Sequence, residues 1–321
     1  MPISRRALLA APALLPALRP PGARAQAPWP ERPVRIVVAF PAGTVTDTLI
    51  RHLSEPLSRE LGQPVIIDNR PGGSGVVGTE SVARSAPDGL TWCVLSVTNG
   101  ALNTYLVPRL SYDPLKDFAP VGYVADTAYI LVVPAASPAR DLKGFVELAK
   151  QRPLTFSYGN ASARIASAML ARMGGAEMTA VPYRGGPEAL TDVIAGRIDS
   201  TFTDFAAGMP QVKEGKVRAL AVTSPQAFAL APEIPPVASL LPGYGVSAWF
   251  GMGLPAATPA PIVARANAAM NAALADPGFI EKVGRLGYVP RGSTPQEFHA
   301  FLRAQIEEMT VRAKEAGLEP G

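Results

Sequence analysis

The feature that most constrains the fold of this chain is a regular alternation of short apolar runs with helical periodicity. Val34 to Phe40 is an apolar run that ends in Pro41-Ala42-Gly43, and leucines then recur every fourth residue from Leu49 to Leu61. The run predicts a buried strand, and the leucine spacing predicts a helix with one apolar face. Pro56 is expected to kink this helix or to restart it one turn later. Strand, loop and helix in this order are typical of βαβ units around parallel sheets, which predicts an α/β fold.

The same alternation continues and divides the chain into two series of elements. Further strands are predicted at 65–68, 90–97, 121–125, 129–133, 154–158, 178–182, 198–202, 219–223 and 247–254. Further helices are predicted after the glycine-rich loop 70–78 and at 145–151, 165–173, 187–195, 206–214, 259–275, 278–286 and 294–316. A chain of 321 residues is long enough for two domains or one large one. The order of elements permits the N- and C-terminal parts to share one domain, with the middle part inserted as another.

The first 25 residues have the composition of an export signal. Arg5 and Arg6 precede an apolar stretch from Ala7 to Leu18, and Ala23-Arg24-Ala25 is a small-x-small cleavage sequence. This stretch is shorter than the roughly 20 apolar residues that a membrane-spanning helix needs. The paired arginines also resemble a twin-arginine signal, so that route and the general secretory (Sec) route both stay open. We expect cleavage after Ala25 and a soluble protein outside the cytoplasm.

Charge and composition exclude several classes of function. The leader holds four of the 30 basic residues and no acidic ones, so the remaining 26 basic residues are balanced by 26 acidic ones. This balance removes the main support for nucleic-acid binding. Cys93 is the single cysteine, and His52 and His299 are the only histidines, which excludes disulfides within the chain and Cys-based or multi-His metal sites. No G-x-S-x-G motif occurs, and we predict neither an enzyme nor a bound metal or cofactor.

The segment Gly73-Ser74-Gly75-Val76-Val77-Gly78 fits the G-x-G-x-x-G pattern between a predicted strand and a predicted helix. A dinucleotide site in this context needs an acidic residue near the end of the next strand, where the chain reads Ser96-Val97-Thr98-Asn99. The favoured interpretation is therefore a tight loop that packs against its neighbours. A nicotinamide-dependent oxidoreductase stays open as an alternative.

Several strand-to-helix loops are rich in glycine and small hydroxyl residues: Pro41 to Asp47, Ser96 to Gly100, Gly159 to Arg164 and Tyr183 to Gly186. In open parallel sheets, such loops lie at the carboxyl ends of the strands, where ligands bind. Helix N-termini there present unpaired backbone N–H groups and a partial positive charge, which favours a carboxylate without any Lys or Arg. The alternative is that the Ser, Thr, Asn and Asp side chains only cap helices.

The order of short motifs along the chain is similar to that of the substrate-binding proteins of tripartite tricarboxylate transporters, the Bug family. The similarity covers residues 29 to 317 and rests on the whole ordered series rather than on any one motif. Its markers are Trp29 to Pro33, Val37 to Gly43, Leu61 to Val65, Asp68 to Gly72, Ala86 to Gly89, Tyr112 to Pro114, Val181 to Gly185, Ala189 to Asp192, Ala219 to Thr223 and Trp249 to Gly251.

The resemblance implies a type II periplasmic-binding-protein fold, in which two Rossmann-like lobes joined by a double hinge crossing close on a small ligand. Residues 30–130 and 250–321 would form the first lobe and 131–249 the second, with crossings near 129–133 and 247–252. It also implies that backbone N–H groups and ordered waters hold a ligand carboxylate. The predicted ligand-binding residues are Phe40, Ala42, Gly43, Thr44, Val45, Thr46, Asp47, Ser96, Thr98, Asn160, Ala161, Ser162, Ala163, Arg164, Tyr183, Gly186 and Asp204.

Two positions depart from the family pattern. Thr44 stands where the family usually has a second glycine, and its β-branched side chain restricts the backbone and occupies cleft volume. Arg164 stands where a loop about two residues longer often ends in histidine. We expect its guanidinium either to form a bidentate pair with a distal ligand carboxylate or to point into water.

The function implied by the resemblance is that of a periplasmic, monomeric solute receptor. It would capture a di- or tricarboxylate, an acidic amino acid or an aromatic acid and present it to membrane permease subunits. Closure of the lobes would create the shape that the partner recognises. An alternative is a signalling module whose liganded form docks a sensor kinase or a regulator.

Overall fold

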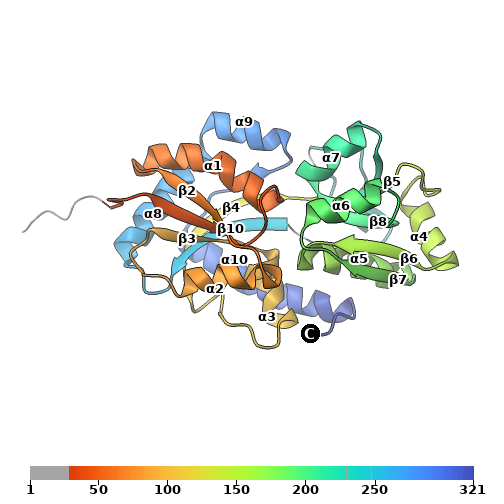
Figure 1. The fold of residues 1–321 in the computed structure, drawn as a ribbon, viewed down its shortest axis with the longest axis horizontal. Helices are drawn as coiled ribbons and strands as arrows, with labels where there is room; N and C mark the ends of the chain where they lie inside the picture. Colours follow the sequence, from red (N-terminus) through yellow and green to blue (C-terminus); the bar gives the residue numbers. More distant parts are fainter. Residues whose placement is uncertain (1–28, 229, 247) are drawn as a thin grey trace, which may run out of the picture.

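Two mixed β-sheets organise the protein and lie next to each other along its longest axis (Figure 1). This computed structural model describes residues 29–321 except 229 and 247, so the predicted export signal lies outside the described residues. The six-stranded sheet has the spatial order β11 (Val289–Pro290), β4 (Phe118–Thr127), β10 (Ala248–Pro255), β3 (Thr91–Ser96), β1 (Val34–Val38), β2 (Val65–Asn69). The five-stranded sheet has the order β7 (Met178–Pro182), β6 (Leu154–Tyr158), β8 (Ser200–Asp204), β5 (Tyr129–Pro134), β9 (Val217–Val222). We call the parts built around these sheets the first and the second lobe.

Helices pack against both sheets, which confirms the predicted α/β class. The first lobe contains α1 (Val45–Leu61), α2 (Val76–Ala83), α3 (Asn103–Leu106), α8 (Ala260–Leu274), α9 (Pro277–Arg285) and α10 (Pro295–Glu315). The second lobe contains α4 (Leu142–Gln151), α5 (Ala161–Gly174), α6 (Gly186–Ile194) and α7 (Phe205–Lys213). Sequence patterns miss α3 and β11, and the predicted loop 96–100 is largely a π-helical turn, η2 (Val97–Leu102). Within the described residues, no helix combines the length and the apolar character that crossing a bilayer requires.

Helix α1 illustrates how local sequence sets an element. Thr44 is its N-cap, and the Thr44 side chain accepts a hydrogen bond from the Asp47 backbone N–H at 3.5 Å. Gly62, with φ of +69°, ends the helix in the left-handed conformation that glycine adopts without strain. The leucines from Leu49 to Leu61 are at most 5% exposed and form the apolar face. The helix continues through Pro56 to Leu61, so the predicted restart is wrong.

Strand directions bring the functional loops of both lobes to one place. β1 runs parallel to β2 and β3, and β6 runs parallel to β7 and β8, whereas β10 and β5 are antiparallel to their neighbours. The chain changes sheet between Thr127 and Tyr129 and again between Val222 and Ala248. β5 begins at Tyr129, two residues before the predicted start of the second lobe at 131. β10 begins at Ala248, two residues before the predicted return to the first lobe at 250. The carboxyl ends of the parallel strands in both sheets face the junction between the lobes (Figure 1).

The glycine-rich segment 73–78 forms a 3₁₀ turn, η1 (Gly73–Gly75), followed by the start of α2. A Cβ atom on Gly75 would lie 3.2 Å from the ring of Phe40. A Cβ atom on Gly78 would lie 2.7 Å from the carbonyl oxygen of Arg70 and 2.8 Å from the Cα of Ala39. The backbone of α2 is thus pressed directly against β1 and its neighbouring loop, which supports the packing interpretation of the motif.

We expect Gly78→Ala to lower the free energy of unfolding by about 1–3 kcal/mol, because the new methyl group meets backbone atoms that have no rotamer to change. Urea unfolding followed by circular dichroism measures this effect. The matched control is Gly284→Ala in α9, where a Cβ atom meets nothing within 4 Å. This control should be neutral or stabilising by up to about 1 kcal/mol. Equal stabilities of the two variants would contradict the packing argument.

Candidate functional site

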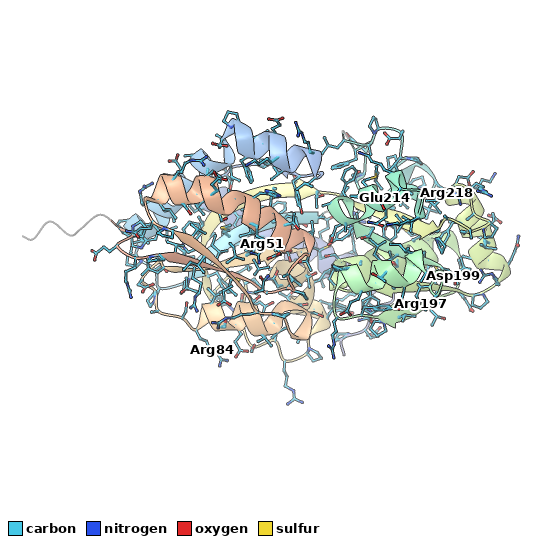
Figure 2. All side chains as sticks on the ribbon, turned by 45° about the horizontal axis from the view of Figure 1, so that its top comes forward. Arg51, Arg84, Arg197, Asp199, Glu214 and Arg218 are labelled. Atoms are coloured by element: carbon cyan, nitrogen blue, oxygen red, sulfur yellow. The ribbon has the colours of Figure 1, made fainter. Side chains whose placement is uncertain are left out.

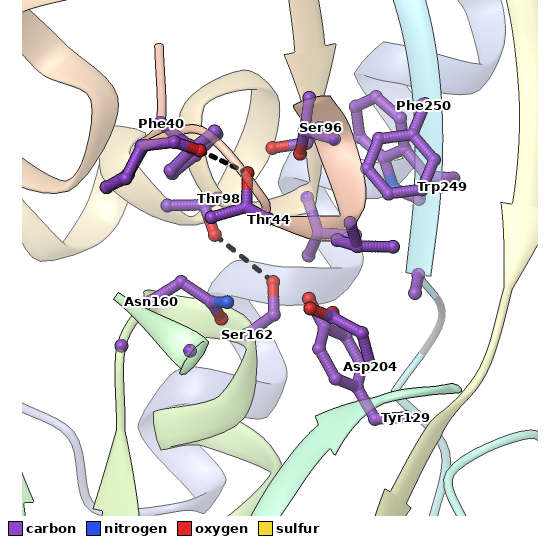
Figure 3. A pocket seen from close by; sticks show the side chains of 17 residues that line it. Phe40, Thr44, Ser96, Thr98, Tyr129, Asn160, Ser162, Asp204, Trp249 and Phe250 are labelled. Atoms are coloured by element: carbon purple, nitrogen blue, oxygen red, sulfur yellow. Dashed lines mark hydrogen bonds between the residues drawn. The ribbon is translucent and has the colours of Figure 1, made fainter. Parts of the chain in front are cut away.

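A pocket lies at the junction of the two lobes, between the strand-to-helix loops (Figure 3). The first lobe contributes Phe40, Pro41, Thr44, Val45, Thr46, Ser96, Val97, Thr98, Ala248, Trp249 and Phe250 to its lining. The second lobe contributes Tyr129, Gly159, Asn160, Ser162, Gly186 and Asp204. The hydroxyl oxygens of Thr98 and Ser162 lie 3.2 Å apart and form a hydrogen bond that joins the lobes. The site is therefore incomplete in either lobe alone.

Several helices begin at this pocket. The N-termini of α1, α5 and α6 and the start of η2 all lie among the lining residues. The first amide groups of a helix have no intrahelical partner and carry a partial positive charge. Thr44 caps α1, and Asn160 caps α5 by accepting the Ala163 N–H at 2.8 Å. Thr44 and Asn160 can therefore both cap a helix and line the pocket, because an N-cap residue lies beside the unpaired backbone N–H groups of the first helical turn.

The electrostatic character of the pocket comes from the backbone rather than from cationic side chains. None of the seventeen residues that line it, all within the described part of the chain, is Lys, Arg or His. Charged residues such as Arg51 on the first lobe and Arg197 and Asp199 on the second lie elsewhere (Figure 2). In the described ranges, no three His, Cys, Asp or Glu side chains gather as ligands for a metal ion. An anion in the pocket would therefore meet mainly amide dipoles and hydroxyl groups.

Asp204 is the only acidic residue in the pocket lining. Its side chain is 5% exposed, and its Oδ1 atom has no hydrogen-bond partner among the described residues. Burial raises the pKa of Asp204 to about 7, while the backbone N–H of Val45 acts in the opposite direction. Burial and the nearby Asp204 also raise the pKa of Tyr129, so its phenol stays protonated. At neutral pH the pocket thus contains a carboxyl group close to its titration midpoint.

The structure brings ten of the predicted residues together in the pocket and places seven outside it. Those in the lining are Phe40, Thr44, Val45, Thr46, Ser96, Thr98, Asn160, Ser162, Gly186 and Asp204. Those outside are Ala42, Gly43, Asp47, Ala161, Ala163, Arg164 and Tyr183. The excluded residues lie on the same loops and first helical turns as those in the lining.

Asp47 stabilises the loop between β1 and α1 through hydrogen bonds with residues outside the pocket lining. Burial acts to raise its pKa, but hydrogen bonds from Arg51, Gly43 and Asn69 outweigh this and lower the pKa below the ordinary value. The Gly43 N–H, the Arg51 Nε and the Asn69 Nδ2 each lie 2.9 Å from a carboxylate oxygen of Asp47. Asn69 also donates to the carbonyl of Phe40 at 3.1 Å. These hydrogen bonds show that Asp47 holds the loop that precedes α1, and Asp47 lies outside the pocket lining.

The predicted contact between Arg164 and a ligand carboxylate is not supported by the geometry. The guanidinium carbon of Arg164 lies 5.8 Å from the ring centroid of Tyr158, in a cation–π contact. Arg164 lines a separate depression with Arg172 and Met178. It follows Ser162 by two residues, about 200° around the helix, so the two side chains leave α5 in nearly opposite directions. Tyr183 likewise turns away from the pocket, and its hydroxyl donates to the carboxylate of Asp192.

Seven further residues that the sequence did not predict line the pocket: Pro41, Val97, Tyr129, Gly159, Ala248, Trp249 and Phe250. Tyr129 is the first residue of β5, and Trp249 follows the first residue of β10. Both strands begin directly after the chain passes from one sheet to the other. The predicted hinge crossings near 129–133 and 247–252 could have indicated these residues, because the chain segments that connect two lobes lie beside the space between them.

The groups considered for nucleophilic chemistry lie away from the pocket. Cys93 is fully buried in β3, and burial raises the pKa of its thiol to about 12, so the reactive thiolate is scarce at neutral pH. His52 belongs to α1 and His299 to α10, and neither lines the pocket.

Comparison with known proteins identifies the family of this chain. Residues 49–318 match the model of the tripartite tricarboxylate transporter family receptor, TctC. The chain belongs to this receptor family. BugT of Bordetella pertussis is 30% identical over 295 residues, which cover 90% of each chain. This is a family of solute-binding receptors and not an enzyme family, so the oxidoreductase alternative loses its support.

Two solved structures resemble this receptor over nearly their whole length. R. palustris Rpa4515 with adipate gives a TM-score of 0.88 at 32% identity, covering 91% of this receptor and 100% of that chain. MatC (Rpa3494) from Rhodopseudomonas palustris with bound malate gives a TM-score of 0.82 at 29% identity, covering 88% and 99%. The predicted Bug-family resemblance and the periplasmic-binding-protein fold are confirmed.

The raised pKa of Asp204 predicts a specific dependence of stability on pH. Between the ordinary Asp pKa and about pH 7, the folded receptor binds more protons than the unfolded chain, so the free energy of unfolding falls as pH rises. Asp204→Asn removes this dependence. Relative to the wild type, the variant should gain on the order of 2–4 kcal/mol between pH 4 and pH 8.

Urea unfolding without ligand at these two pH values measures the difference. Asp47→Asn is the contrasting control, because the pKa of Asp47 is lowered in the folded state and its contribution to stability is present at neutral pH. That variant should lose stability relative to the wild type at pH 7 and lose less at pH 3. Parallel stability profiles of wild type and Asp204→Asn would contradict the assignment.

Proposed function

We propose that this receptor captures a small organic dicarboxylate in the pocket between its lobes and presents it to the permease subunits of a tripartite transporter. The observation that carries the proposal is the convergence of the N-termini of α1, α5 and α6 on one pocket without a cationic side chain. Backbone amides at helix N-termini bind carboxylates. The relatives crystallised with adipate and malate support a dicarboxylate as the ligand.

The distribution of amides favours a ligand with two carboxylates over one. α1 and η2 present their amides from the first lobe, whereas α5 and α6 present theirs from the second. One carboxylate would engage one lobe, and a second carboxylate at the other end of the ligand would engage the opposite lobe. Such a ligand stabilises the closed arrangement because it binds both halves of the pocket at once.

The proposed partner and location follow from family membership. Receptors of the tripartite tricarboxylate transporter family deliver their solute to a membrane permease. This receptor would work in the periplasm after removal of the predicted export signal. The permease would recognise the closed arrangement of the lobes. We propose a monomer, because one chain contributes both walls of the pocket.

Isothermal titration calorimetry of the purified receptor with adipate and malate tests the proposed ligand class. We expect dissociation constants in the micromolar range and a rise in the unfolding temperature, since a ligand at 100 times its dissociation constant stabilises by about 2.7 kcal/mol. Hexanoate, with one carboxylate, and adipamide, with none, should bind at least tenfold more weakly. Absence of binding by both dicarboxylates, or equal binding of adipamide, would refute the proposal.

Val45→Pro tests the contribution of the helix amides. Val45 is the first residue of α1, where proline fits the backbone and removes the N–H donor, which also interacts with the carboxyl group of Asp204. A lost hydrogen bond to a charged ligand group should weaken adipate by about tenfold or more. Val45→Ala keeps the N–H and is the control for the lost side chain. Equal affinities of the two variants would show that this amide makes no contact with the ligand.

A further inference from the structure

Asp204 occupies an unusual position for an acidic residue in a pocket proposed to bind anions. It is the last residue of β8 and the N-cap of α7, yet its side chain makes no capping hydrogen bond to that helix. The carboxyl group instead points into the pocket beside Ser162 and Tyr129 (Figure 3). Its Oδ1 atom is buried and has no partner among the described residues. A buried polar atom without a partner requires an explanation, and a bound ligand would supply one.

Within the described part of the chain, no cationic group acts on Asp204 to neutralise its ionised form. The titratable groups that act on it or on its neighbours are Tyr129 from β5 and Tyr288, which precedes β11. From α1 comes Asp47, whose charge is already paired with Arg51 at 2.9 Å. The residues that α5, α6 and their caps add to the pocket are Asn160, Ser162 and Gly186, none of which titrates. The pocket thus has no cation to hold two carboxylates together.

We propose that Asp204 is a specificity-determining residue that carries a proton in the liganded receptor and donates a hydrogen bond to a ligand carboxylate. The inference rests on the proposed function and deepens it, because it makes ligand capture a proton-coupled event. Two carboxylates that share one site cannot both remain ionised without a large cost in repulsion. A single proton between them converts this repulsion into a charge-assisted hydrogen bond.

The proton that Asp204 holds in the liganded receptor comes from solvent, and the pH decides how much of it is taken up when the ligand binds. Burial already raises the pKa of Asp204 to about 7 in the unliganded receptor, and an anion beside it raises the pKa further. At pH 8 the proton comes from solvent and moves onto a carboxylate oxygen of Asp204 when the ligand enters. At pH 6 most receptor molecules already hold it. Binding should therefore weaken as pH rises above 7, approaching tenfold per pH unit.

The experiment is calorimetric titration of the full receptor with adipate at pH 6.5, 7, 8 and 9, each in two buffers with different ionisation enthalpies. We expect the dissociation constant to rise at least tenfold from pH 6.5 to pH 9. We also expect the enthalpy difference between buffers to report uptake of close to one proton per ligand at pH 8. Both measurements use the wild-type receptor, so they do not depend on a variant that folds.

Asp204→Asn keeps the shape of the side chain and replaces the titrating proton by a permanent amide donor. This variant should bind adipate with a dissociation constant that changes less than threefold across the pH range and without proton uptake. Glu214→Gln makes the same carboxylate-to-amide change at the other end of α7, outside the pocket, and should keep the wild-type pH profile.

The possible outcomes separate this inference from the proposed function. Binding by wild type that is constant from pH 6.5 to 9 would overturn the role of Asp204 and leave the proposed function standing. Binding that strengthens with rising pH and releases protons would also overturn it, because Asp204 would then lose its proton when the ligand binds. If neither adipate nor malate binds at any pH, the proposed function and this inference both fail.

Discussion

Unpaired backbone amides at the starts of helices are the interaction on which the rest of this structure depends. The parallel strands β1 and β3 of one sheet and β6 and β8 of the other all end at the junction of the lobes. Each strand is followed by a helix or helical turn whose first N–H groups lack a partner inside the helix. Because these groups come from two sheets, they face the same volume from opposite sides. The positive character of the pocket is therefore a property of topology and does not require a basic residue.

Several polar side chains of the pocket are small, and each has a structural role at the helix ends or at the lobe junction. Thr44 and Asn160 close the helix ends that they cap, while Thr98 and Ser162 meet across the junction. Larger side chains at these positions would separate the lobes. Asp204 is the exception, since it places an acid among donors. Its burial raises its pKa to about 7, and below that pH the protonated carboxyl group can donate a hydrogen bond like the groups around it.

Much of the fold was predictable because periodicity is a local property. The leucine spacing of α1 and the apolar run of β1 specify elements without knowledge of distant contacts. Elements shorter than a few residues or without periodicity were not predictable, and η2 and β11 are the examples. Family resemblance predicted loops that contribute residues to the lining of this pocket. It did not distinguish Ser162, which lines the pocket, from Arg164, which lies over Tyr158, because two positions within one helical turn differ mainly in the direction of their side chains.

Sequence by itself determined the α/β class, the loops at the strand ends and the lack of cysteine or histidine clusters, because these are properties of residue type and spacing. Tertiary structure alone decided that Asp47 supports a loop while Asp204 enters the pocket. Both are aspartates at the start of a helix, and only the packing around them differs. Hydrogen bonds from Arg51, Gly43 and Asn69 stabilise the charge of Asp47, whereas burial outweighs the single backbone N–H of Val45 and favours the neutral form of Asp204. Desolvation and hydrogen bonding depend on residues distant in the chain, and no local pattern records them.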